Sequence, residues 1–210
     1  MYVKLIMPDT PTPRTKAEQR ETTTAALIAA ARELFAERGY AAVGTQEIVQ
    51  RAGVTRGALY HHFKDGKEEL FRAVLVELSA ELVRHVVALA SAADDPFEEL
   101  VVGCEGFLDA CARPDVQRIM LVDGPSVLGW DVLREIDSGY ALGALEAALQ
   151  GAMDAGALSP APANAVAHVL LGALDEAVMV IARADDQTAA REEMGKTVRR
   201  LLEGLRAPAI

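Results

Sequence analysis

The stretch "TQEIVQRAGVTRGALYHHF", residues 45–63, decides the fold of this chain. Thr45 is a good N-cap for a short helix whose first turn carries an acidic residue. Gly53 then falls where a helix end needs a residue that tolerates positive φ. Thr55 is a second N-cap and opens another short helix. Two helices of about two turns each, joined by a tight turn, are typical of a helix-turn-helix.

The second helix of this motif has two different faces. Leu59 and Phe63 are apolar and four residues apart, so they pack inward, and His62 is drawn to the same side. The opposite face combines a cation, a position without a side chain, a phenol and an imidazole. These residues are Arg56, Gly57, Tyr60 and His61. Because neighbouring residues on a helix point about 100° apart, the two histidines belong to different faces and do not form a metal site.

The outward face fits the major groove of DNA. The second helix of a helix-turn-helix places its N-terminal residues at the base edges, and arginine there can donate two hydrogen bonds to guanine. Arg56 occupies that first turn, and Gly57 lets the backbone approach closely. Helix N-termini also favour phosphate. Further candidates for phosphate contacts are Thr45, Thr55, Tyr60, His61 and Lys67. Short amphipathic helices joined by a glycine turn also occur in proteins that do not bind DNA, so the pattern alone leaves that alternative open.

Helical periodicity continues on both sides of the motif. Residues 1–15 carry three prolines and are expected to form a mobile arm. Asp65 and Glu68 have the spacing of a capping box, and Asp95–Glu98 is a second helix start. The stretch "DGPS" at 123–126 is expected to be a loop. The pattern predicts an all-α fold of about nine helices, which besides the two short ones cover about 17–38, 67–91, 96–113, 116–122, 130–155, 163–183 and 188–205.

Composition and charge limit the classes of function. The chain has 210 residues and a formal charge of −10. Residues 1–72 carry a net charge of +2 and residues 73–210 a net charge of −12, so only the first part suits a polyanion. The sequence offers neither a signal peptide nor a run of about 18 apolar residues, which predicts a cytoplasmic protein without a membrane span. Cys104 and Cys111 are expected to be buried free thiols.

An enzyme is the competing class. No nucleophile–base–acid set, glycine-rich phosphate loop or cluster of metal ligands stands out in the sequence. We therefore expect no catalytic residue, metal or cofactor. A third possibility is a helical DNA-binding or interaction module that has no small-molecule effector.

Several elements at fixed spacing coincide with one known family. They are the "A..LF.E.GY" pattern ending at Tyr40, then "I...AGV", "T.GALYHHF" and "K.EL". Residues 23–75 thereby strongly resemble the N-terminal domain of TetR-family transcriptional regulators. The resemblance implies a homodimer that binds a palindromic operator, usually as a repressor released by a small molecule. One departure from the family is Gly66, an additional residue in "KDGK" before Lys67.

The resemblance also divides the chain. It implies a helix-turn-helix domain at 16–64, with the motif at about 45–64, and an effector-binding and dimerisation domain at 65–210. By position, it implies DNA contacts at Thr45, Gln46, Thr55, Arg56, Gly57, Tyr60, His61 and Lys67.

The second part of the chain has two further features. The helices at 163–183 and 188–205 are apolar enough to suggest a four-helix bundle with a second copy, although an intrachain core is the alternative. Aromatic and isolated polar residues on the middle helices are candidates for a pocket, although each is also a plausible core residue. These are His85, Phe107, Met120, Asp123, Trp130 and Tyr140. Such a lining predicts an apolar or aromatic effector of modest size.

Overall fold

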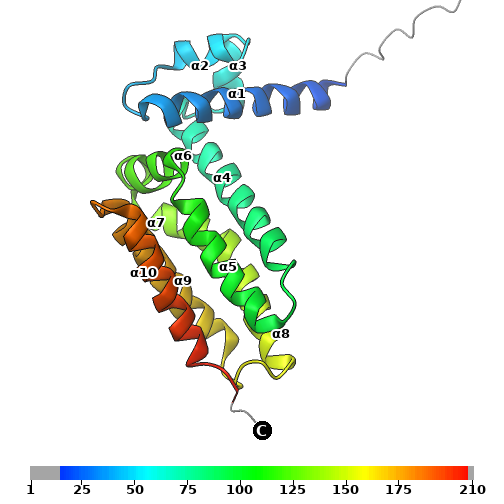
Figure 1. The fold of residues 1–210 in the computed structure, drawn as a ribbon. Coiled ribbons are helices and arrows are strands. Elements are labelled where there is room, and N and C mark those ends of the chain that lie inside the picture. Colours follow the sequence, from blue (N-terminus) through cyan, green and yellow to red (C-terminus); the bar gives the residue numbers. More distant parts are fainter. Residues whose placement is uncertain (1–14, 208–210) are drawn as a thin grey trace, which may run out of the picture.

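The structure, a computed structural model, describes residues 15–207, and these form the all-α fold that the sequence predicts. Within this range the only β-type pairing is a single bridge between Leu158 and Arg206. Helix α1 lies across one end of the molecule with two short helices beside it, and the other helices run lengthwise as a bundle (Figure 1). The predicted N-terminal arm falls on residues outside the described range, except Thr15, which caps α1.

The three N-terminal helices are placed by their caps. Helix α1, Lys16–Arg38, starts with a capping box between Thr15 and Glu18 and ends at Gly39, whose φ is 79°. Helix α2 is Thr45–Arg51 and α3 is Arg56–His62. The Thr55 hydroxyl accepts the Ala58 N–H at 3.2 Å, as predicted for an N-cap.

Two predicted caps are wrong. The N-cap of α2 is Gly44 and not Thr45, because the Glu47 carboxylate accepts the Gly44 N–H at 3.2 Å and draws the start of the helix one residue earlier. Asp65 does not cap α4, which spans Lys67–Ala90 and is preceded by Gly66 at a φ of 66°. The additional glycine supplies this left-handed residue, for which a side chain would be strained.

The bundle consists of α4 and the helices that follow it. Helix α5, Pro96–Cys111, starts at Asp95, whose carboxylate accepts two backbone N–H groups, as predicted. Helix α8, Gly143–Asp154, packs between α5 and α9, Ala163–Arg183. Helix α10, Gln187–Glu203, covers α5 and α9. Both cysteines are buried free thiols, and burial raises the pKa of each to about 12.

The middle of the chain differs from the sequence prediction. A one-turn helix α6, Pro114–Val116, continues as the π-helix η1, Gln117–Asp123, and then as α7, Gly124–Asp137. The expected loop at 123–126 is therefore helical, because Pro125 lies in the first turn of α7, where its missing N–H costs nothing. The break comes instead at Gly129, with a φ of 80°. A second π-helix, η2, Ser138–Leu142, joins α7 to α8.

Many apolar residues of the two helices expected at a dimer interface, α9 and α10, are buried within one chain. Leu170, Leu174 and Val178 on α9, and Val198 and Leu202 on α10, belong to the core. The two helices pack against each other and against α5, and these contacts cover the inward side of each. The outer side of the pair still exposes large apolar residues. They are Val169, Val180 and Leu201.

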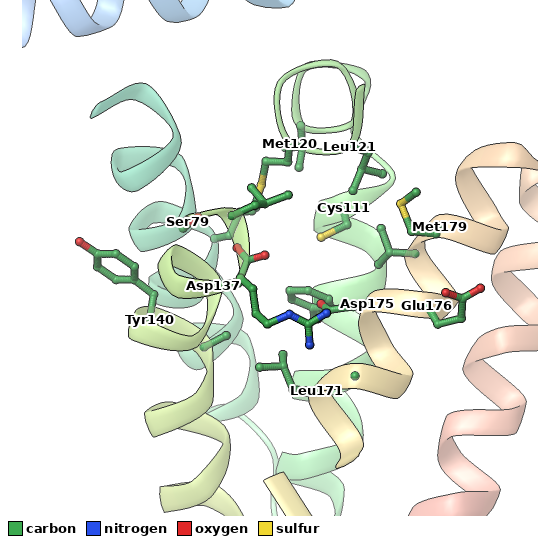
Figure 2. A pocket seen from close by; sticks show the side chains of 18 of the residues that line it. Ser79, Cys111, Met120, Leu121, Asp137, Tyr140, Leu171, Asp175, Glu176 and Met179 are labelled. Atoms are coloured by element: carbon green, nitrogen blue, oxygen red, sulfur yellow. The ribbon is translucent and has the colours of Figure 1, made fainter. Parts of the chain in front are cut away.

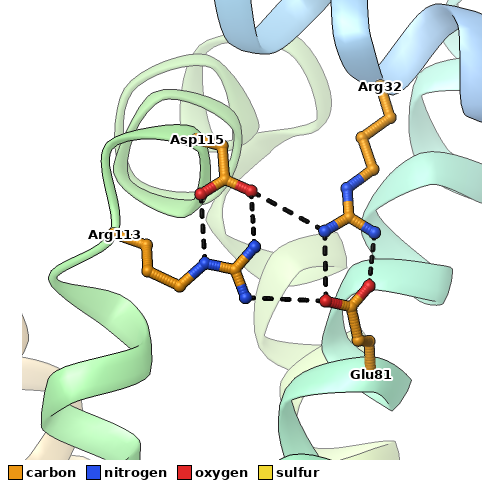
Figure 3. A network of polar contacts seen from close by, with 4 residues as sticks. All are labelled: Arg32, Glu81, Arg113 and Asp115. Atoms are coloured by element: carbon orange, nitrogen blue, oxygen red, sulfur yellow. Dashed lines mark hydrogen bonds and ion pairs between the residues drawn. The ribbon is translucent and has the colours of Figure 1, made fainter.

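Four charged side chains join α1 to the bundle (Figure 3). Arg32 on α1 forms an ion pair with Glu81 on α4 and lies 3.7 Å from Asp115 on α6. Arg113 completes the network with a contact of 2.7 Å to Asp115 and 3.5 Å to Glu81. Because each charge has at least two opposite neighbours, the network holds α1, α4 and α6 in one arrangement.

A second set of contacts joins η1 to the end of α1. The Tyr40 N–H donates to the Asp123 carboxylate at 2.8 Å, and Arg118 donates to the Arg38 carbonyl at 3.2 Å. The Arg118 guanidinium also lies directly against Gly39, where an added Cβ would collide with it. The N-terminal helices are thus connected to the bundle through η1 as well as through α4.

We predict that Arg32→Met lowers the free energy of unfolding by about 1–2 kcal/mol at neutral pH, because it leaves Glu81 without its principal partner. Arg32 holds the pKa of Glu81 below its usual range, so this stabilisation exists at neutral pH and is lost on acidification. Urea unfolding at several pH values measures it. Arg20→Met, an exposed arginine of the same helix, is the control, and equal losses in both variants would contradict the prediction.

Candidate DNA-binding surface and effector cavity

The outward face of α3 is arranged as the sequence predicts. Leu59 is fully buried and Phe63 nearly so, while Arg56, Gly57, Tyr60 and His61 are exposed. Gln46 on α2 is exposed as well, and Thr45 is partly so. These six residues lie on two neighbouring helices that are packed against each other and form what we call the recognition surface.

Arg56, Tyr60 and Thr45 are neighbours on this surface. The Arg56 guanidinium lies 5.7 Å from the centre of the Tyr60 ring. Hydrogen bonding to Arg56, and to a lesser degree to Thr45, lowers the pKa of the Tyr60 phenol. The start of α2 and the middle of α3 therefore present a cation, a phenol and a hydroxyl side by side. This combination can donate hydrogen bonds to base edges and phosphates.

The two histidines have separate surroundings, as predicted. His62 is partly buried, and its Nδ1 lies 2.9 Å from the Thr24 hydroxyl on α1. Desolvation, with the nearby His61 and Arg20, lowers the pKa of His62, so it is neutral at physiological pH. It joins α3 to α1, whereas His61 remains on the exposed side.

Lys67 is held by the protein. Its Nζ donates to the carbonyls of Tyr40 and Val43, each at 3.0 Å, and lies 3.9 Å from the centre of the Tyr40 ring. Burial lowers its pKa. These contacts connect the start of α4 to the loop before α2, so in this structure the ammonium supports the recognition surface from behind.

Gly57 has no packing reason to be glycine. A Cβ added there would have only the Thr55 hydroxyl within 4 Å, at 3.9 Å. Its φ is not among the positive values in the described chain. The absence of a side chain thus leaves the surface of α3 open beside Arg56.

The bundle encloses a cavity of about 340 Å³ between α4, α5, η1, α7, η2 and α9 (Figure 2). Of the six residues proposed for a pocket, Phe107, Met120, Trp130 and Tyr140 line it. His85 does not, because it points outward from α4. Asp123 does not either, because it accepts the Tyr40 N–H at the end of α1. A second cavity of about 590 Å³ adjoins the first and shares Val83, Phe107, Ala141 and Leu171 with it.

Two acidic residues of the cavity were not predicted from the sequence. Asp137 from α7 and Asp175 from α9 lie around the same space (Figure 2). Burial and the proximity of Asp175 raise the pKa of Asp137 to about 7. Asp175 is exposed to solvent on one side, and the partial burial of its carboxyl raises its pKa to about 6 against the opposing effect of Arg134. Asp175 could have been found in the sequence, because it lies within "LLGALDEAVMV", part of the most apolar helix of the chain, where a carboxylate is unexpected.

We predict that Gly57→Ala stabilises the protein by about 0.5–1 kcal/mol, since alanine is the better helix former and the site has room for it. The same change should weaken DNA binding, because a methyl group would then stand where the backbone approaches the groove. Thermal unfolding and fluorescence anisotropy measure the two effects. Gly143→Ala on α8, equally free of neighbours, should leave DNA binding unchanged. Unaltered DNA affinity in Gly57→Ala would contradict the close approach.

We also predict that Asp137→Asn raises the free energy of unfolding by about 1–3 kcal/mol at pH 8. A carboxyl whose folded pKa is raised contributes most stability at low pH, and that contribution is lost as the pH rises from the unfolded pKa toward about 7. The advantage of asparagine should therefore be largest at pH 8 and shrink at pH 4.5. Urea unfolding at both pH values measures it against Glu135→Gln, on the same helix but outside the cavity. A pH-independent effect would contradict the assignment.

Two family models match the chain. The first, described as bacterial regulatory proteins of the TetR family, covers residues 27–74. The second, the tetracyclin repressor-like C-terminal domain, covers residues 97–205, just over half of the 210. The first contains the recognition surface and the second contains most of the cavity lining.

Individual proteins agree with this assignment. The TetC protein of transposon Tn10 from Escherichia coli is 30% identical over 130 residues, 62% of this chain and 65% of TetC. The transcriptional activator FasR of Mycolicibacterium smegmatis is 41% identical over 83 residues, 40% of this chain and 37% of FasR. These alignments thus span less than two thirds of each curated relative.

Solved structures match over more of the chain. A TetR-family regulator from Pectobacterium atrosepticum has 32% identity and a TM-score of 0.81, covering 94% of this chain and all of that one. RolR in complex with resorcinol shares the fold, with 22% identity, a TM-score of 0.68, and coverage of 93% and 100%. Because a single family model covers more than half of its residues, this chain belongs to the TetR family of bacterial transcriptional regulators.

Proposed function

We propose that this protein is a cytoplasmic, homodimeric repressor that binds a palindromic DNA operator and is released from it by a small molecule. Residues 16–64 would read the DNA, and residues 65–210 would bind the effector and dimerise. The observation that carries the proposal is the exposed face of α3, where Arg56, Tyr60 and His61 surround a glycine that packing does not require. We assign the protein no enzymatic activity.

The dimer would form through α9 and α10, that is, through the predicted helices at 163–183 and 188–205. Val169 is 75% exposed and Leu201 is 54% exposed, a large apolar area for two helices that face water. By length and hydropathy alone, α9 would also pass for a membrane span. Its packing against α5, α8 and α10 favours a bundle helix, and a second copy on the outer face would cover its remaining apolar side.

Release from DNA would work through the walls of the cavity. Helix α4 and η1 both line it, and both carry contacts to α1: Glu81 on α4, and Arg118 and Asp123 on η1. An effector that binds one position of these walls more tightly than another would shift α1 and change the separation of the two α3 helices. That separation has to match major grooves about 34 Å apart. RolR, whose structure contains resorcinol, is a protein of this fold with a small ligand.

The experiment is selection of bound DNA from a random pool with the full-length protein, followed by competition with the selected site. We predict that Arg56→Ala lowers affinity for the selected site by about 10- to 100-fold and relaxes the preference at one base pair of each half-site. Arg84→Ala, an exposed arginine midway along α4, removes the same charge and should change neither. Undiminished specific binding by Arg56→Ala, or selection of no sequence at all, would refute the proposal.

A further inference from the structure

Asp137, Asp175 and Ser79 are three of the cavity-lining polar side chains that have no partner within the described chain. Within residues 15–207, the half-buried carboxylate of Asp137 and the solvent-exposed carboxylate of Asp175 accept no hydrogen bond and belong to no ion pair. The third is Ser79 on α4. The residue is only 4% exposed, and its buried Oγ has no hydrogen-bond partner.

Of these three groups, Ser79 gives the strongest indication that the cavity binds a polar group. A hydroxyl in an apolar environment costs free energy unless it is hydrogen-bonded. A serine in a helix can satisfy its hydroxyl by donating to the carbonyl one turn earlier, as Ser91, directly after α4, does to Val87 at 2.8 Å. Ser79 makes no such bond and instead lines the cavity. It is available as an acceptor for a group that enters.

The balance of charge around the cavity is acidic. Three carboxylates line it, on Asp137, Asp175 and Glu176, against two guanidinium groups, on Arg134 and Arg183. Arg134 offsets part of the charge at Asp175. No arginine lowers the pKa of Asp137 in this way. Burial and the proximity of Asp175 both oppose the ionisation of its carboxyl. A positive charge that enters the cavity would relieve both.

We propose that the cavity binds an organic cation, a protonated amine or quaternary ammonium on an apolar body, with the cationic group held between Asp137 and Asp175 and beside the Ser79 hydroxyl. This inference rests on the proposed function, in which this cavity is the effector site. It makes the expectation of a merely apolar or aromatic effector more specific. An anion would be repelled by the two carboxylates, and a neutral molecule would leave the charge of Asp137 uncompensated.

The remaining walls suit the apolar body of such a molecule. Phe107, Trp130 and Tyr140 line the cavity, Phe107 from inside and Trp130 and Tyr140 as exposed side chains, and aromatic faces attract cations as well as apolar groups. Beyond Phe107 and Leu171, the second cavity is lined almost entirely by aliphatic side chains and glycine. A molecule with its charge at Asp137 could extend its body in that direction.

Isothermal titration calorimetry on the full-length protein at pH 8 tests the proposal. The probes share a body and differ in charge: 4-phenylbutylamine, 4-phenylbutanol and 4-phenylbutyrate, with the corresponding 2-naphthylethyl and n-octyl series to vary the body. We expect the amine to bind about tenfold or more tightly than the alcohol in at least one series, and the carboxylate to bind most weakly. An alcohol that binds as tightly as its amine in every series, or no binding by any amine, would overturn the proposal.

Substitutions in the cavity test where the ammonium group of the ligand binds. Asp137→Asn should lower amine affinity about tenfold and abolish the preference over the alcohol, while Ser79→Ala should lower it about threefold. Glu135→Gln removes a carboxylate from the same helix outside the cavity and should leave binding unchanged. Because Asp137→Asn is expected to stabilise the fold, its loss of binding would not arise from unfolding. Unchanged preference in Asp137→Asn would overturn the assignment of the site.

A DNA readout separates this inference from the proposed function. If an amine binds through Asp137 but leaves the selected DNA site occupied, the ligand class stands and release by this cavity fails. If a neutral phenol such as resorcinol releases the DNA and no amine binds, the proposed function stands and the ligand class is overturned.

Discussion

The ion pair between Arg32 and Glu81 is the contact on which the arrangement of the two parts depends. It joins the middle of α1 to the middle of α4, and Arg113 and Asp115 extend it to the segment that starts α6 and η1. Charged groups of this kind are directional, so they specify one relative position where apolar packing alone would tolerate several. The proposed release from DNA needs such a position, because the spacing of the two recognition helices would carry the signal.

The same segments form the cavity wall. Met120 and Leu121 of η1 face the cavity, whereas Arg118 and Asp123 of the same π-helix hold the end of α1. π-Helical turns are rare and are frequent at functional sites. A small rotation of η1 would therefore move cavity-facing and α1-facing side chains together. Under the proposed function, the polar network on α4 and α6 would favour discrete arrangements over a gradual rotation, so that a small local shift becomes a change between two states.

The sequence predicted the outward and inward faces of α3 because helical spacing separates Leu59 and Phe63 from Arg56 and Tyr60 within seven residues. It predicted four residues of the pocket but not its acidic pair, since Asp137 and Asp175 come from helices about 40 residues apart and meet only through tertiary packing. Asp123 was misplaced for the same reason: its partner, the Tyr40 N–H, lies in a distant segment. Thr45 has the composition of an N-cap, but Glu47 and Gly44 together supply a cap one residue earlier.

The unpartnered carboxylates have a cost that an effector can offset. Burial and the proximity of Asp175 oppose the ionisation of Asp137, so its carboxyl carries either an unfavourable charge or a bound proton. A ligand couples to DNA binding only as far as it distinguishes two positions of the cavity walls. Asp137 lies near the end of α7 and Asp175 on α9, so a cation between them would draw these elements together, whereas the apolar lining alone would accept either spacing. Asp137, whose buried carboxyl is unfavourable for stability, would thus be well placed to discriminate between the two positions of the cavity walls.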